Sequence, residues 1–260
     1  MARSDRFTGR TVVVTGGAGG IGQELCAGFA AEGAAVAVVD VDDAAAGRVA
    51  TSVSDAFAGP ARGYAVDVRD AGAVRDLMAR VHDELGGPHV LVCLAGGSLG
   101  TPRDLPEIEP EHVDLVVDVN VKGTFFCCQA AVPFMVAAGG GAIVTTSSIG
   151  GRQPSPVTGV PYATAKAAVV GLTKRLAREV GGSGVRVNAV APGLFLTDRL
   201  QAMYDSMSES ERHGVLEAVP LNRFPEIREA VEPILFLASD ESSYVTGVVL
   251  DVNGGRFMPL

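Results

Sequence analysis

Residues 11–25 read TVVVTGGAGGIGQEL, and this stretch decides the fold. Its start, Thr11–Val14, is a short β-branched run typical of a strand that is buried on both faces. A glycine-rich turn, Thr15–Gly22, follows at once, and a helical pattern begins at Gln23. Glycines let the backbone approach a ligand closely, and a helix N-terminus offers free amides, so this order predicts a pyrophosphate site. No Lys-Ser or Lys-Thr follows the glycines, which disfavours a nucleoside triphosphatase.

The alternation of short apolar strands and longer helices continues along the chain. Seven strands are predicted, at Thr11–Val14, Ala35–Val39, Gly63–Val66, Val90–Leu94, Ala142–Thr146, Val185–Val190 and Val248–Leu250. Six helices are predicted, at Gln23–Glu32, Asp43–Ala56, Ala71–Leu85, Glu111–Ala138 (bent or broken), Tyr162–Val180 and Arg228–Ala238. This pattern predicts the α/β class, with a doubly wound seven-stranded parallel sheet of Rossmann type and helices on both faces.

A single domain, residues 1–260, is expected. The glycine clusters Gly139–Gly141 and Gly181–Gly184 each lie where a helix must end before a strand, which indicates turns and not linkers. The Met-, Ser- and Glu-rich stretch Thr197–Pro220 departs from the pattern and is predicted to be a small helical insertion. Insertions beyond the carboxyl edge of such a sheet tend to cover the ligand crevice.

Composition excludes several classes of protein. Hydrophobic residues make up 47% of the 260 residues, and the net charge of −9 argues against a nucleic-acid surface. The N-terminus, Met1–Arg10, is polar, and no stretch approaches the 18 apolar residues of a membrane span. The four cysteines lie in apolar segments, and the histidines show no ligand spacing with them. A cytoplasmic protein with reduced, buried thiols and no metal is expected.

The cofactor is predicted to be NAD and not NADP. The second strand ends at Asp40, about 20 residues beyond the glycine turn, where dinucleotide sites place an acid against the ribose hydroxyls. A carboxylate there repels a 2′-phosphate, and no Arg or Lys lies in the turn or directly after Asp40. The alternative is that Asp40 caps the next helix, as Asp42 or Asp43 could. Asp67-Val68, which ends the third strand, either meets the adenine ring or caps a helix.

Tyr162-Ala163-Thr164-Ala165-Lys166 opens a helix and places Tyr162 and Lys166 on one face. A free phenol titrates near pH 10, and an ammonium one turn away lowers the phenol pKa and makes proton transfer practical at neutral pH. Such pairs are common on helix surfaces. This one follows the strand that ends in Thr145-Thr146-Ser147-Ser148, which favours a catalytic interpretation.

Taken in order, these motifs resemble the short-chain dehydrogenase/reductase family over essentially the whole chain. The resemblance implies an oxidoreductase that moves a hydride between nicotinamide and a secondary alcohol or ketone. It rests on T-G-x-x-x-G-I-G at Thr15–Gly22, Asn120, Ser148, Tyr162-x-x-x-Lys166, Pro192-Gly193, Tyr244–Gly247 and Asn253–Gly255.

The resemblance also implies a role for each matched residue. Tyr162 exchanges the substrate proton, Lys166 lowers the Tyr162 pKa and binds the nicotinamide ribose, Ser148 hydrogen-bonds the reacting oxygen, and Asn120 holds a relay water. Ser147 is expected to be structural. The cofactor-binding residues predicted here are Gly16, Gly20, Ile21, Gly22, Asp40, Asp67, Val68, Ala95, Gly96, Tyr162, Lys166, Pro192, Gly193 and Thr197.

Leu94 departs from the family pattern. Relatives usually carry Asn-Ala-Gly after the fourth strand, where this chain has Leu94-Ala95-Gly96, so the brace that the Asn supplies to the sheet and the cofactor pocket is missing. The substrate pocket is expected to comprise Ser98–Glu107, Gly150–Val160 and Thr197–Pro220. Arginines 103, 152 and 199 lie in these segments and are interpreted as solvated loop residues in preference to ligands of an anionic substrate.

Three other functions are compatible with parts of the pattern. An NAD-binding epimerase or dehydratase shares Tyr-x-x-x-Lys but usually has a longer chain, and a methyltransferase needs only the glycine turn and the acid. A non-catalytic NAD-binding regulatory protein is opposed by the complete catalytic set. A homotetramer acting on a small-molecule substrate is expected, because two helices carry more apolar surface than one sheet face covers. The side chains concerned are Phe125, Phe126, Phe134, Val169, Val170 and Leu172.

Overall fold

The structure is a computed structural model that describes residues 5–155, 157–196, 201, 204–205 and 207–259. Within these residues one sheet of seven parallel strands has the order β3-β2-β1-β4-β5-β6-β7. The strands are β1 (Thr11–Thr15), β2 (Ala35–Asp40), β3 (Ala61–Ala65), β4 (Val90–Cys93), β5 (Gly141–Thr146), β6 (Val185–Pro192) and β7 (Val249–Val252). The chain builds outward from β1 in one direction and then crosses to β4, so the crevice at the switch point opens between β1 and β4. The predicted fold class is confirmed.

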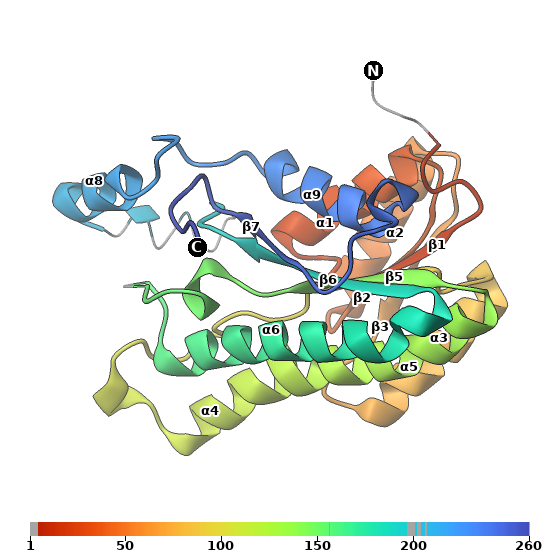
Figure 1. Ribbon diagram of the computed structural model, residues 1–260, viewed down its shortest axis with the longest axis horizontal. Helices are drawn as coiled ribbons and strands as arrows, with labels where there is room; N and C mark the ends of the chain where they lie inside the picture. Colours follow the sequence, from red (N-terminus) through yellow and green to blue (C-terminus); the bar gives the residue numbers. More distant parts are fainter. Residues whose placement is uncertain (1–4, 156, 197–200, 202–203, 206, 260) are drawn as a thin grey trace.

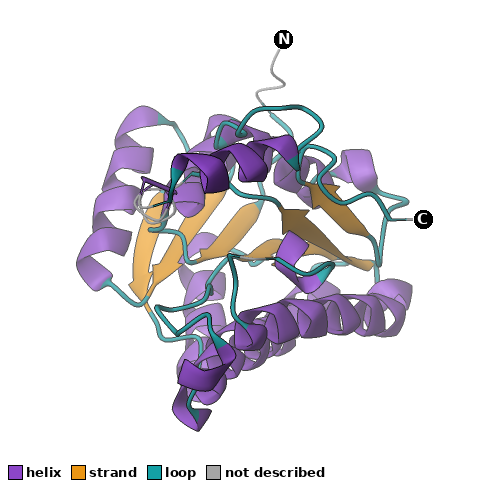
Figure 2. Cartoon of the chain, turned by 90° about the vertical axis from the view of Figure 1, so that its left-hand side faces the viewer, coloured by secondary structure: helices purple, strands orange, loops and turns teal. Residues whose placement is uncertain are grey.

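Helices cover both faces of the sheet (Figures 1 and 2). One face carries α1 (Gly20–Ala31), α2 (Asp43–Ala56) and α9 (Arg228–Ala238), and the other carries α3 (Ala71–Leu85), α5 (Thr124–Ala137) and α6 (Val160–Val180). A strand that is covered on both faces must be apolar at consecutive positions. The run Val12–Val14 meets this demand, with all three side chains fully buried.

The long helix after β4 is interrupted, as predicted. A π-helical turn, Asp118–Gly123, separates α4 (Pro110–Val117) from α5. The whole run, Pro110–Ala137, is long and apolar enough to cross a membrane by length and composition, contrary to the expectation that no stretch comes near. Cys127, Cys128 and Met135 are nevertheless fully buried in the core, so one face of α5 packs as a core helix does.

The predicted insertion contains one described helix, α8 (Glu209–Glu217), which stands apart from the layers at one end of the molecule (Figure 1). Residues 197–200, 202–203 and 206 of this stretch lie outside the described residues. The interface prediction needs correction for Val169, which is fully buried within this subunit. Phe126, Phe134 and Leu172 are partly buried against the core on the face of the sheet that carries α3 and α5. Phe125 remains 48% exposed.

Candidate active site

A groove of about 930 Å³ runs along the carboxyl edge of the sheet at the switch point. It collects residues that are far apart in the sequence, because parallel strands all end at this edge. Eleven of the predicted site residues line it, namely Gly16, Gly20, Ile21, Gly22, Asp40, Asp67, Val68, Ala95, Gly96, Tyr162 and Lys166. Asn120, Ser148, Pro192 and Gly193 do not line it, and Thr197 lies outside the described residues.

Two glycines of the turn, Gly16 and Gly22, leave no room for a side chain. Gly16 has a φ of +69°, and a Cβ there would lie 2.8 Å from the backbone nitrogen of Ala95. A Cβ on Gly22 would lie 2.2 Å from the carbonyl oxygen of Gly16. Helix α1 starts at Gly20, and the preceding Gly19 offers no side chain to cap it. The first amides of α1 therefore keep their capacity to bind an anion.

Asp40 holds the turn and does not cap a helix. Its carboxylate accepts hydrogen bonds from the backbone nitrogens of Ala18, at 3.1 Å, and Asp42, at 3.3 Å. The cap of α2 is Asp42, whose side chain accepts from the backbone nitrogen of Ala45. The cap of α3 is Asp70 and not Asp67. The capping alternatives for Asp40 and Asp67 are therefore wrong.

Arg69 is a basic residue of the groove that the sequence interpretation overlooked. Its guanidinium donates to both carboxylate oxygens of Asp67 at 2.5–3.0 Å. These hydrogen bonds hold the pKa of Asp67 below its usual value. The signal is present in the sequence, because Arg69 follows Asp67 by two residues after the third strand, away from the glycine turn and from Asp40.

Lys166 is buried beside Tyr162. Its ammonium nitrogen donates a 2.8 Å hydrogen bond to the carbonyl oxygen of Thr146 and lies 5.6 Å from the centroid of the Tyr162 ring. Only 4% of the residue is exposed, and this burial lowers the pKa of Lys166 to about 8. Tyr162 lies in the first turn of α6, so both side chains face the groove from one helix.

The two serines after β5 have different roles. Ser147 donates from Oγ to the carbonyl oxygen of Lys166 at 2.8 Å and is 1% exposed, which confirms its structural role. Ser148 precedes the 3₁₀ turn Ile149–Gly151, and its Oγ accepts from the backbone nitrogen of Gly150 at 3.1 Å. Because Oγ is the acceptor in that bond, its own hydrogen is left to donate elsewhere.

Asn120 is fully buried in the π-helical turn. Its amide nitrogen donates to the carbonyl oxygens of Gly97 and Val116, and its Oδ1 accepts from the backbone nitrogen of Gly97. Both amide hydrogens are therefore used within the protein. The side chain clamps the Gly96–Gly97 loop to the helix, which leaves its amide no hydrogen for the relay water that the resemblance implies.

Comparison with known proteins establishes the family. A family model described as enoyl-(acyl carrier protein) reductase matches residues 16–256. The chain is 37% identical over 252 residues to the 3-oxoacyl-[acyl-carrier-protein] reductase FabG of Thermotoga maritima, covering 96% of this chain and 98% of the relative. It is also 37% identical over 261 residues to the cyclohexanol dehydrogenase of Rhodococcus sp., covering 95% and 96%. The chain belongs to the short-chain dehydrogenase/reductase family.

A solved structure agrees with this assignment. The 3-oxoacyl-[acyl-carrier protein] reductase of Brucella melitensis with bound NAD matches this short-chain dehydrogenase/reductase with a TM-score of 0.87. The two are 34% identical, and the match covers 99% of this chain and 95% of that one. The protein is an oxidoreductase of a family that binds nicotinamide cofactors, so the expected family, fold and general reaction class are confirmed.

In this short-chain dehydrogenase/reductase the backbone nitrogens at positions 94 and 95 connect β4 to β1. The backbone nitrogen of Leu94 donates to the carbonyl oxygen of Thr15 at 3.1 Å. The next nitrogen, that of Ala95, donates to the Thr15 hydroxyl at 3.3 Å. β4 is thus tied to β1 at the groove floor without an Asn side chain.

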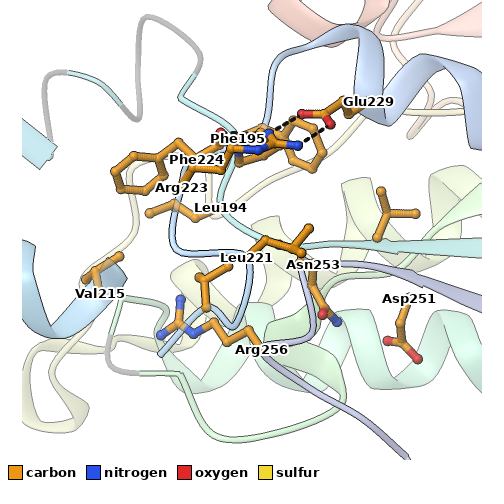
Figure 3. A pocket seen from close by; sticks show the side chains of 15 residues that line it. Leu194, Phe195, Val215, Leu221, Arg223, Phe224, Glu229, Asp251, Asn253 and Arg256 are labelled. Carbon is orange, nitrogen blue, oxygen red and sulfur yellow. Dashed lines mark hydrogen bonds and ion pairs between the residues drawn. The ribbon is translucent and has the colours of Figure 1, made fainter. Parts of the chain in front are cut away.

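A second cavity has a volume of about 240 Å³, and Figure 3 shows the side chains around it. Gly193 lines this cavity and not the groove. Phe195 faces the cavity and Leu196 faces the groove, so the segment after β6 forms the wall between the two. Further side chains around the cavity are Leu194, Val215, Leu221, Phe224, Asp251 and Arg256.

The structure corrects one arginine in the predicted substrate segments of this short-chain dehydrogenase/reductase. Arg152 is not a solvated loop residue, because its side chain is 15% exposed and pairs with Asp251 at 3.0 Å. Arg103 is 59% exposed beside Asp104, and Arg199 lies outside the described residues. Two of the predicted substrate-pocket segments, Ser98–Glu107 and Gly150–Val160, are in contact. A Cβ on Gly159 would lie 2.7 Å from the carbonyl oxygen of Pro102.

Proposed function

We propose that the protein is an NAD(H)-dependent oxidoreductase that interconverts a secondary alcohol and the corresponding ketone. One observation carries this proposal, the buried Lys166 ammonium beside the Tyr162 ring in the same groove as the glycine turn and Asp40. A dinucleotide site alone serves many reactions, whereas an acid–base pair within that site supports proton transfer coupled to hydride transfer. A small-molecule substrate, a homotetramer and a cytoplasmic location remain part of the proposal.

The residues that line the groove fit NAD. The glycine turn and the uncapped start of α1 suit a pyrophosphate, and the Asp40 carboxylate suits ribose hydroxyls and repels a 2′-phosphate. Arg69 is the nearby cation, but Asp67 already engages its guanidinium. NAD over NADP is therefore the proposed preference.

The protein contributes proton transfer and orientation at the reacting carbon. Bound nicotinamide supplies or accepts the hydride. Tyr162 exchanges a proton with the substrate oxygen, and the Lys166 ammonium stabilises the phenolate that results in one direction. The free hydrogen of the Ser148 hydroxyl is available for the same oxygen. Asn120 acts indirectly, by holding the Gly96–Gly97 loop against Lys166.

Turnover assays test the proposal and separate it from its rivals. Purified protein is incubated with NADH or NADPH and a panel of ketones, 3-oxoacyl thioesters and enoyl thioesters. Ketone-dependent oxidation of NADH is the expected result. Oxidation that depends only on enoyl thioesters would instead support the reaction in the description of the matched family model. An epimerase or dehydratase would convert substrate without net change in NADH, and a regulatory protein would bind NADH without turnover.

A further inference from the structure

We propose that the ion pair between Arg152 and Asp251 positions the loop that carries Ser148. This inference rests on the proposed function, which places Ser148 at the reacting oxygen. Arg152 ends the 3₁₀ turn that Ser148 begins, and Asp251 lies in β7. The guanidinium nitrogen Nη2 lies 3.0 Å from Oδ2 of Asp251, and the two side chains are 15% and 14% exposed. In Figure 3 Asp251 stands to one side of the apolar cavity, away from Val215 and Phe224.

The loop is held between two elements. On its inner side it touches α6 directly, since a Cβ on Gly151 would lie 2.5 Å from the carbonyl carbon of Lys166. It cannot move closer to α6 without a clash between backbones. The Arg152–Asp251 pair ties the end of the same loop to β7. The ion pair thus opposes displacement of the end of the loop away from β7.

The C-terminal segment covers the pair. The Phe257 ring lies 5.0 Å from Cζ of Arg152, within the range of a cation–π contact. Gln153, next in the loop, donates to the carbonyl oxygen of Arg256 at 3.4 Å. The side chain of Asn253 shapes this segment by accepting from the backbone nitrogens of Gly255 and Phe257. The loop with Ser148 is thereby linked to residues a hundred positions further along the chain.

The pair is poorly suited to a purely stabilising role. Among the described residues, Nε of Arg152 and Oδ1 of Asp251 are buried without hydrogen-bond partners. Burial raises the pKa of Asp251 despite the adjacent guanidinium, so desolvation outweighs the attraction. Buried ion pairs of this kind add little net stability, but the loss of one partner leaves an uncompensated charge. The pair instead fixes the position of the loop relative to β7.

Hydrogen exchange measured by mass spectrometry tests the positioning without any substrate. The variants are Arg152→Met and Asp251→Asn. Arg62→Met is the control, because Arg62 lies in the distant edge strand β3 and forms a 3.0 Å ion pair with Glu84 of α3. We expect at least tenfold faster exchange in the peptide that contains Gly151–Gln153 of both variants. Exchange in α3 of these two variants, and in the loop peptide of the control variant, should stay unchanged. Unchanged exchange in the loop peptide of both variants would overturn the inference. If either single variant fails to fold, Arg152→Met/Asp251→Leu, which removes both charges, takes its place.

Kinetics separate positioning from general damage. Neither residue lines the cofactor groove, so kcat for ketone reduction should fall at least tenfold while the NADH dissociation constant stays within twofold. Arg152→Lys, which keeps the charge, should recover part of kcat. Equal losses in kcat and NADH affinity would contradict a positioning role. If the wild-type protein reduces no ketone but the loop peptide still responds to the variants, the proposed function fails and the positioning inference stands.

Discussion

The ammonium nitrogen of Lys166 lies 5.6 Å from the centre of the Tyr162 ring, and the carbonyl oxygen of Thr146 holds it there. The two residues share one face of α6 because four positions separate them. The burial of a charged amine is costly in a protein interior. The burial of this lysine with a single backbone acceptor among the described contacts is the observation behind its proposed catalytic role.

Replacement of Tyr162 by Phe should abolish most turnover. The change removes the transferable proton and keeps the ring, so kcat should fall by about 10²-fold or more, while the NADH dissociation constant stays near the wild-type value. Stopped-flow turnover and NADH fluorescence titration measure the two quantities. Tyr244→Phe is the matched control, since Tyr244 is fully exposed. Near-wild-type turnover in Tyr162→Phe would show that the proposed mechanism is wrong.

The free energy of unfolding should depend on pH through Lys166. Its pKa is about 8 in the folded protein and about 10.4 in an unfolded chain. Between these values the unfolded chain binds more protons, so stability rises with pH, by at most about 1.4 kcal/mol per pH unit from this group. Below pH 8 both states are protonated and the contribution is constant.

Urea unfolding without cofactor at pH 7.5, 8.5 and 9.5 checks this linkage. The free energy of unfolding of the wild-type protein, relative to that of Lys166→Met, should increase as pH rises. Lys174→Met, a change at an exposed position of the same helix, should show no such trend. Differences that stay constant with pH for Lys166→Met would refute the prediction.

The two ends of β1 offer a matched test of the brace at the groove floor. Thr15→Val removes the hydroxyl that accepts from Ala95, and Thr11→Val removes the hydroxyl that donates to the carbonyl oxygen of Leu85. Each change should destabilise the fold by about 1 kcal/mol. Only Thr15→Val should weaken NADH binding, because only that end of the strand faces the groove. Equal NADH affinities in the two variants, measured by calorimetry, would contradict the proposed brace.

Cofactor preference should reverse in Asp40→Ala/Val41→Arg. The double change removes the carboxylate that repels a 2′-phosphate and adds a cation at an exposed position on the groove wall, since Val41 is 72% exposed. Asp42→Ala is the control, because it removes the cap of α2, at a cost of about 1 kcal/mol, and leaves the groove intact. The ratio of kcat/KM for NADPH and NADH is the measurement. A higher ratio for the wild-type protein than for the double variant would refute the role of Asp40.

Oligomerisation should depend on the outer face of α4 and α5. Val113, Phe125 and Val136 are 40–48% exposed there, so Phe125→Lys should weaken self-association. Light scattering at micromolar concentration should show a tetramer for the wild-type protein and smaller species for the variant. A monomeric wild-type protein would disprove the expected assembly.

The interior of the fold was largely predictable from the sequence. The predicted bounds of α2, α3 and α9 agree with the structure, because their helical periodicity is clear and Asp42 and Asp70 mark two of their starts. The ends of the predicted strands agree with the structure within two residues. The glycine turn was predictable because the motif itself requires a tight turn before a helix, and Tyr162 with Lys166 because a helix brings residues four apart together.

Contacts between distant segments were decided only by the tertiary structure. The sequence places Arg152 in a loop and Asp251 near the end of the chain, and nothing in either segment indicates that the two meet. The same is true of the Asn120 amide, which donates one of its hydrogens to the carbonyl oxygen of Gly97 in a distant loop. Sequence periodicity reports local geometry and burial, which follow from a few neighbouring residues. The pairing of polar groups depends on which loops the sheet order brings to one edge, and that order is a property of the whole chain.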